Sequence, residues 1–168
     1  MRKTSKTPES QCLEHAIRLL TRTTQSKRRL HEKLSAAYPT TLIEDTLKEL
    51  EARGMLNEEK DCRLWLNHHL MGSKSNKEIF YALLKRGYAK ELVTKVMKEI
   101  GDDREIEVVQ KLLQQKLRGK PKTEVAVQKA WLFLQRKGFS TNVIRVTLQQ
   151  QKFEEELLSI EENTDSSS

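Results

Sequence analysis

The sequence has 168 residues, enough for one ordinary domain or a few small modules. Aromatic residues make up 5%, and there are only six glycines and three prolines, which argues against a β-sandwich or barrel with its many turns and aromatic strands. Charged residues (33%) nearly equal hydrophobic ones (36%), a balance typical of amphipathic helices that each bury one narrow stripe.

The charge is unevenly distributed along the chain. The net charge is +7, but six of the 24 acidic residues and no basic residue lie from Glu154 onward. Residues 1–153 therefore carry all 31 lysines and arginines against 18 acids. A body this basic favours a polyanionic partner, either nucleic acid or a protein–nucleic-acid assembly, although a merely solubilising surface is the alternative.

The first helices are predicted from stripes of apolar residues and from capping residues. The stripe that includes Cys12 and Ala16 predicts one helix, and Ser26 opens a second. Pro39 starts a third helix, for which Thr41 and Glu44 have the spacing of a capping box. Arg53-Gly54 ends it, because glycine tolerates the left-handed backbone that follows many helices.

The next six helices follow the same pattern. A helix with Cys62, Trp65 and Leu66 on one stripe precedes a capping box at residues 75–78. That box opens a helix ending at Arg86-Gly87, and another helix runs from about residue 90 to 100. A seventh begins near Arg104, an eighth runs from Thr123 to Lys137-Gly138, and Ser140 caps the last.

A threefold repeat organises these helices. The aromatic residues Tyr38, Tyr88 and Phe139 are 50 and then 51 positions apart. Apolar residues recur eight positions before each aromatic and five and nine positions after it; they are Leu30, Ile43 and Leu47, then Phe80, Val93 and Met97, then Trp131, Ile144 and Leu148. Such a period predicts three copies of one unit.

We therefore predict an all-α fold of three tandem three-helix modules in an elongated, slightly curved array. The modules are expected at residues 11–55, 56–101 and 102–153, between a flexible N-terminus (1–10) and an acidic, disordered tail (154–168). Trp65 and Trp131 are expected in the core. The tail could fold back on the basic body and compete with DNA, or could simply be solvated.

No residue pattern predicts catalysis. Cys12 and Cys62 lie too far apart for a C-x-x-C motif and are expected to be buried thiols, and His68-His69 lacks partners at metal-ligand spacing. Serines at helix starts have the role of caps, and there is no phosphate-binding loop. With no leader or membrane segment predicted, we expect a cytoplasmic, monomeric protein with no enzymatic activity, cofactor, metal or membrane contact.

Three segments resemble the RecX family in their order and spacing. They are residues 47–58 followed by Leu64-Trp65-Leu66, residues 79–88, and residues 129–140. The chain departs from the family pattern at Asn57-Glu58, at Asp61-Cys62, at His69 and at residues 72–76, and so resembles a divergent member.

The resemblance implies three tandem three-helix modules and a function in recombination and DNA repair. A RecX-like protein is expected to bind in the groove of the RecA–DNA filament and to inhibit or modulate RecA ATPase, strand exchange and co-protease activity. The candidate contacts to RecA or to DNA phosphates are the basic residues off the apolar stripes: Arg28, Arg29, Lys33, Lys74, Lys77, Lys85, Arg86, Lys122, Lys129, Arg136 and Lys137.

The alternative is a DNA-binding protein of the helix-turn-helix kind, since capped three-helix units can mimic that motif. Against it, residues 42–52 are mostly acidic and apolar, and no third helix is expected to be rich in the Arg, Asn and Gln that contact base edges.

Overall fold

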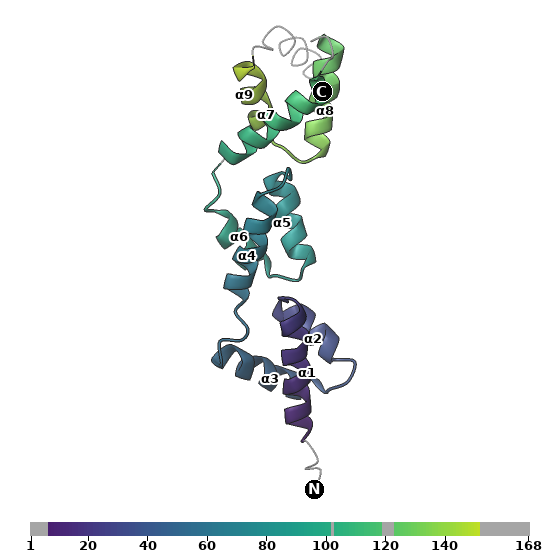
Figure 1. The fold of residues 1–168 in the computed structure, drawn as a ribbon, viewed down its shortest axis with the longest axis vertical. Helices are drawn as coiled ribbons and strands as arrows, with labels where there is room; N and C mark the ends of the chain where they lie inside the picture. Colours follow the sequence, from purple (N-terminus) through teal and green to yellow (C-terminus); the bar gives the residue numbers. More distant parts are fainter. Residues whose placement is uncertain (1–6, 102, 119–122, 152–168) are drawn as a thin grey trace. The chain divides into compact units, whose positions relative to one another are not determined.

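The structure is a computed structural model that describes residues 7–101, 103–118 and 123–151. These residues form nine α-helices and no strand (Figure 1). The helices are α1 (Pro8–Arg22), α2 (Lys27–Leu34), α3 (Thr40–Ala52), α4 (Glu58–Leu70), α5 (Asn76–Lys85), α6 (Lys90–Met97), α7 (Asp103–Leu117), α8 (Glu124–Arg136) and α9 (Thr141–Gln150). The predicted all-α, tandem helical fold is confirmed.

The chain packs as two compact units. The first lies within residues 1–68 and 82–96, and the second within residues 69–81 and 97–168. Helices α4 and α5 each begin in one unit and end in the other. The Lys122 position falls in the segment 119–122, outside the described residues, as do the predicted tail at 154–168 and the first six residues.

The first unit has a core made by α1, α2 and α3. Figure 1 shows α3 running across the line of α1, and α2 packs against both. The buried residues of this core are Cys12, Ala16, Leu30, Leu34, Ile43, Leu47, Leu50 and Leu56. Cys12 and, in α4, Cys62 are buried free thiols, as predicted.

The capping box predicted for α3 is wrong. The helix begins at Thr40, and its N-cap is Pro39, which has no side chain that can accept a hydrogen bond. Pro39 has the extended backbone of an N-cap (φ −69°, ψ 151°), so Thr41 already lies inside the first turn. Gly54 follows the helix with φ +67°, the left-handed conformation expected there.

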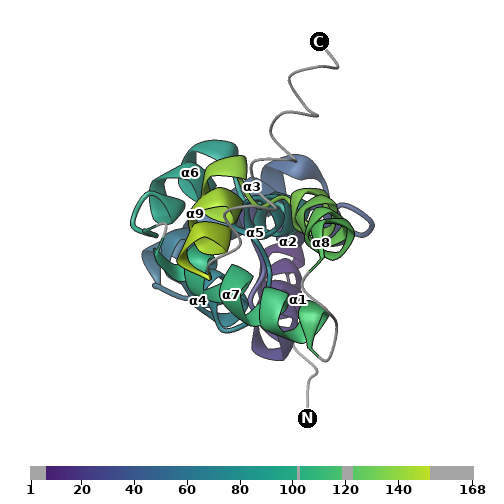
Figure 2. The same cartoon turned by 90° about the horizontal axis from the view of Figure 1, so that it is seen from above.

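The second unit has a core made by α7, α8 and α9, which Figure 2 shows side by side. Its buried residues are Val108, Val109, Leu113, Val127, Ala130, Trp131, Leu134, Phe139, Val143, Ile144 and Leu148. The predicted caps Thr123 and Ser140 each accept a backbone N–H three residues ahead. These caps hold the start of α8 and α9 in place.

Helix α6 is shorter than predicted. It ends at Met97 rather than near residue 100, and the chain leaves it through a turn in which the Ile100 N–H donates to the Met97 carbonyl at 3.1 Å. Gly101 follows this turn, so the glycine marks the end of the connection and not the end of the helix.

Candidate partner-binding surface

A serine at the start of α2 ties that helix to the end of α5 within the first unit. The Ser26 side chain is 1% exposed. Its Oγ accepts the Arg29 N–H at 3.3 Å and donates to the Arg86 carbonyl at 2.9 Å. Gly87 follows with φ +91°, and a Cβ built there would meet Ser26 Oγ at 2.6 Å. The glycine therefore leaves the space that the serine needs.

The same arrangement recurs in the second unit between the start of α5 and the end of α8. Ser75 Oγ accepts the Glu78 N–H at 3.1 Å and donates to the Lys137 carbonyl at 2.6 Å. Gly138 follows with φ +84°, and a Cβ there would approach Ser75 Oγ to 3.0 Å. We call each of these contacts a Ser–Gly joint.

A glutamate completes each joint. Glu58 Oε1 accepts the Lys27 N–H at 2.8 Å, and Glu105 Oε1 accepts the Asn76 N–H at 2.6 Å. In both cases the carboxylate satisfies a first-turn amide that has no partner inside its own helix, at the positive end of the helix dipole. The two joints are thus copies of one three-residue contact.

The first joint brings four of the candidate cations together. The Arg29 guanidinium donates to the Lys85 carbonyl at 3.0 Å, which places Arg28 and Arg29 of α2 beside Lys85, the last residue of α5, and Arg86, which follows it. We call Arg28, Arg29, Lys85 and Arg86 the first-unit cluster. Glu32 pairs with Arg28 at 3.0 Å and lies 3.7 Å from Arg29, so the cluster keeps a surplus of positive charge.

Arg86, although it lies off the apolar stripe, is half-buried rather than solvated. Its guanidinium stacks over the Trp65 ring, 3.1 Å from the ring centroid. Desolvation lowers the pKa of Arg86, and the nearby charge of Arg29 lowers it further. The Trp65 Nε1–H donates to Thr24 Oγ1 at 2.9 Å, so Trp65 lies at the edge of the core, whereas Trp131 is buried as predicted. The Arg86 side chain is therefore held against Trp65 within the cluster and does not extend into solvent.

The second joint brings Lys77 and Lys137 together. Lys77 Cβ would lie 3.3 Å from a Cβ on Gly138, directly after Lys137. The Lys137 ammonium lies 5.6 Å from the centroid of Phe133, and Lys116 approaches the same ring to 4.5 Å. Lys74 makes a different contact, with its Nζ 3.3 Å from His69 Nδ1.

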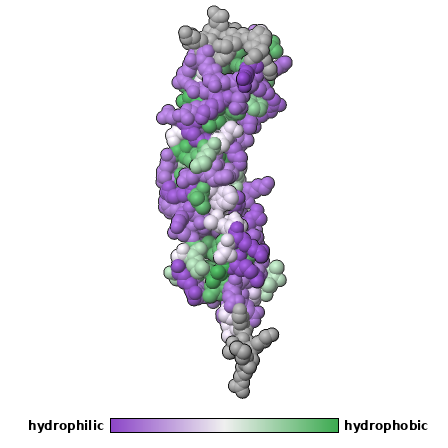
Figure 3. Space-filling view, in the orientation of Figure 1, coloured by the Kyte–Doolittle hydropathy of each residue, from purple (hydrophilic) through white to green (hydrophobic). Residues whose placement is uncertain are grey.

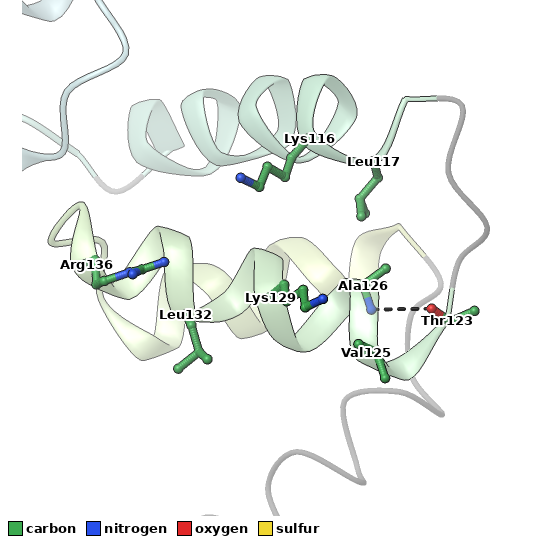
Figure 4. Close-up of a pocket in the computed structure, with 8 residues that line it drawn as sticks. All are labelled: Lys116, Leu117, Thr123, Val125, Ala126, Lys129, Leu132 and Arg136. Carbon is green, nitrogen blue, oxygen red and sulfur yellow. Dashed lines mark hydrogen bonds between the residues drawn. The ribbon is translucent and has the colours of Figure 1, made fainter.

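Lys129 and Arg136 line an open groove of about 520 Å³ between α7 and α8. Figure 4 shows them on α8, facing the side from which Lys116 of α7 extends. The residues lining the groove are Lys116, Leu117, Thr123, Val125, Ala126, Lys129, Leu132 and Arg136, and none of them is acidic. We call this the α7–α8 groove.

The remaining candidates are spread over the surface. Lys33 is exposed on α2, away from the joint. Figure 3 shows that hydrophilic side chains cover most of the face drawn there, with small apolar patches between them. The structure therefore gathers the candidates into the first-unit cluster, the Lys77–Lys137 pair and the α7–α8 groove.

Arg104 is a structural residue that the sequence did not single out. Its guanidinium donates to the carbonyls of Leu70 (3.2 Å), Gly72 (3.0 Å) and Lys74 (2.9 Å), and so holds the connection between α4 and α5. Nothing in the local sequence distinguishes it from a surface arginine, because its acceptors are backbone carbonyls about 30 residues earlier.

Metal-binding clusters and membrane helices are both absent from the described residues. No group of three or more His, Cys, Asp and Glu side chains in that part of the chain could hold a metal ion. No helix within the same ranges is long and apolar enough to cross a bilayer.

Comparisons with known proteins agree with the resemblance seen in the sequence. Residues 102–148 match the family model described as RecX, third three-helix domain. A regulatory protein RecX from Caldanaerobacter subterraneus subsp. tengcongensis is 26% identical over 136 residues, which cover 80% of this chain and 67% of that protein.

Solved structures share the fold. RecX from Lactobacillus salivarius superposes with a TM-score of 0.79 at 18% identity, covering 84% of this chain and 95% of that one. A second structure, titled regulatory protein RecX, gives 0.73 at 17% identity over 84% and 71% of the two chains. Residues 102–148 thus match a RecX family model, and most of the sequence aligns with a regulatory protein RecX, so the chain is similar to that family of regulatory proteins.

Proposed function

We propose that this protein binds in the groove of the RecA–DNA filament and modulates RecA ATPase, strand exchange and co-protease activity by contact, with no catalysis of its own. The observation that carries the proposal is that Ser–Gly joints gather cations in both units: the first-unit cluster at one joint and Lys77 with Lys137 at the other. The similarity to a regulatory protein RecX supports RecA as the partner.

The physical reason is charge complementarity at repeated positions. A nucleoprotein filament presents phosphates and acidic side chains periodically, and basic groups carried on a repeated structural element can contact several of them at once. Lys85 and Arg28 are exposed, so a partner can contact both, although Arg28 also pairs with Glu32 at 3.0 Å. Arg29 instead donates to the Lys85 carbonyl, and the Arg86 guanidinium stacks on the Trp65 ring.

The test is RecA's DNA-dependent ATPase, measured with increasing amounts of this protein. We expect the double variant Arg28→Gln, Lys85→Gln to need several times more protein for the same effect, since two exposed charges of the cluster are removed. Lys48→Gln is the matched control, because Lys48 is exposed on α3 in the same unit and lies 3.4 Å from Asp45. Equal effects of wild type, double variant and control would contradict the proposal.

Direct reading of DNA is a second candidate, favoured by α9. This third helix of its module exposes Asn142, Arg145 and Gln149, which are residue types that pair with base edges. The expectation that no third helix would carry such residues is therefore wrong for α9. Sequence-selective DNA binding that weakens in Asn142→Ala and Arg145→Ala would favour this candidate, whereas weak binding to every sequence favours the filament.

A further inference from the structure

The α7–α8 groove has an unusual lining for an exposed helix face. Val125, Lys129, Leu132 and Arg136 are three or four residues apart and share one face of α8. Val125 is 57% exposed and Leu132 is 49% exposed, so two large apolar side chains alternate with two cations. Such a face is suited to a ligand that is both apolar and acidic.

The groove differs from three other hollows among the described residues in having no acid in its lining. Those hollows include Glu58, Glu105 and Glu107 respectively. The groove instead combines three cations with three large aliphatic side chains: Lys116, Lys129 and Arg136 with Leu117, Val125 and Leu132. Its charge is therefore not balanced by its own lining.

The C-terminal segment 154–168 has the complementary composition. It carries six acidic residues and no basic residue. Leu157, Leu158 and Ile160 stand between its two runs of glutamates. The same segment thus offers apolar residues flanked by negative charge, which complement the apolar residues and cations that line the groove.

The segment starts close enough to reach the groove. Gln110 Nε2 of α7 donates to Gln150 Oε1 at the end of α9, at 2.9 Å. Lys116 lies six residues further along α7, about 9 Å away at the rise of an α-helix. The six residues from Gln151 to Leu157 can span up to roughly 20 Å, so Leu157 can reach the groove without any change in α9.

We propose that residues 154–168 dock in the α7–α8 groove of the same chain and cover its cations. Leu157, Leu158 and Ile160 pack on Val125 and Leu132, and the flanking glutamates pair with Lys116, Lys129 and Arg136. A polyanion that binds more tightly displaces the segment and gains access to this face. The inference does not depend on which polyanion the protein binds.

Tethering lets a weak contact be well occupied. A segment held at an effective concentration of about 1 mM, with an intrinsic dissociation constant of about 0.1 mM, is docked about 90% of the time. A competing anion that needs the free groove is then weakened roughly tenfold. The contact between exposed charges is screened by salt, so the effect shrinks as ionic strength rises.

The first test compares the full chain with a neutral-tail variant in which Glu154, Glu155, Glu156, Glu161 and Glu162 become Gln and Asp165→Asn is added. Amide NMR signals of Val125, Lys129 and Leu132 are expected to differ between the two proteins at low salt, while those of α3 stay unchanged. Unshifted groove signals would overturn the docking. Shift differences that grow with protein concentration would also overturn it, since they would indicate binding to another copy.

The second test adds a synthetic peptide of residues 154–168 to the neutral-tail protein. We expect the same groove signals to move, and Lys129→Gln with Arg136→Gln to abolish the movement. Lys33→Gln with Lys48→Gln is the matched control on α2 and α3 and is expected to leave it intact. Equal peptide binding by both double variants would mean that only the net charge of the protein matters. The groove would then not be the binding site.

The third test measures affinity for a thymidine oligonucleotide, used as a plain polyanion. The neutral-tail protein is expected to bind roughly tenfold more tightly than wild type at low salt. Equal affinities would overturn the shielding role.

Discussion

Gly87 determines whether the first Ser–Gly joint can close. Its φ of +91° is costly for a residue with a side chain, and an added Cβ would meet Ser26 Oγ at 2.6 Å. We expect Gly87→Ala to lower the free energy of unfolding by about 1 kcal/mol for the backbone and by about 1–3 kcal/mol more for the displaced serine. Urea unfolding followed by circular dichroism measures the change.

Gly54→Ala separates the two costs. Gly54 has φ +67°, but a Cβ there would meet nothing within 4 Å, so only the backbone cost of about 1 kcal/mol remains. If Gly54→Ala and Gly87→Ala destabilise the protein equally, the close approach of Ser26 contributes nothing to stability.

Cys62 is a second residue whose behaviour follows from burial. Burial raises the pKa of its thiol to about 11, and the charge of Glu58 adds to the shift. Because the thiolate is disfavoured in the folded protein, this contribution to stability is complete below a pH of about 8.5 and is lost as the pH rises toward 11. We expect wild-type stability to fall over that range more steeply than that of Cys62→Ala, as measured by urea midpoints at pH 7.5 and 10.

Labelling with a thiol reagent provides an independent check on Cys62. The thiol is expected to react at pH 8 only when urea unfolds the chain. Rapid labelling of the folded protein at Cys62 would mean that this part of α4 opens readily.

At the scale of elements, the connection between α4 and α5 depends on Arg104. Three of its hydrogen bonds end on carbonyls of residues 70–74, so we expect Arg104→Lys to loosen this segment without unfolding α7. Amide hydrogen exchange across residues 71–76 should accelerate, while exchange in α8 should not change. Uniform acceleration over the whole second unit would instead indicate global destabilisation.

The sequence predicted helix starts well wherever a side chain forms the cap. Ser75 and Glu78 form the reciprocal capping box that their spacing indicated, with distances of 3.0 and 3.1 Å. The spacing of Thr41 and Glu44 was equally good and was wrong, because Pro39 had already set the start of α3. A local pattern cannot show which of two adjacent starts the chain uses.

The offsets counted from the aromatic residues fit the helix after each aromatic better than the helix before it. In α6, Val93 and Val96 are buried at the same offsets as Ile43 and Thr46, although Met97 is half-buried; in α5, Ile79 is buried and the predicted Phe80 is only half-buried. The link between the last buried leucine and the aromatic has four steps from Leu34 to Tyr38 but five from Leu83 to Tyr88 and from Leu134 to Phe139. Counting back from the aromatic therefore missed the buried face of α5.

The candidate surface was only partly predictable. Basic residues off the apolar stripes could be identified by sequence, and most of them are exposed. Their grouping could not, because it depends on a serine and a carbonyl 60 residues apart. The glycines before Tyr88 and Phe139 could be seen in the sequence. That they leave space for Ser26 and Ser75 could be seen only in the structure.

For the whole molecule, charge governs how binding responds to salt. Residues 1–153 carry 31 bases against 18 acids, so binding to a polyanion should release counterions. We expect the logarithm of the affinity for RecA-coated DNA to fall linearly with the logarithm of salt concentration. Removing Arg28 and Lys85 should reduce that slope by about one unit for each phosphate that is no longer neutralised. An unchanged slope would place these residues outside the interface.

The Ser–Gly joint also has a consequence for association between copies of the chain. The serine at a helix start and the glycine after a helix end are complementary. Complementary surfaces on one molecule can link copies head to tail into open-ended fibres. The first module has Ala37 where Gly87 and Gly138 precede the aromatic in the others. The end of its second helix therefore lacks the glycine that leaves space for a serine side chain. In the third module, Ala126 stands where the other two have the serine, four and eight residues before the buried Ala130 and Leu134. The N-cap of α8 is instead Thr123, which is exposed and lies three residues earlier. We therefore expect this contact to form within the chain and not between copies of it.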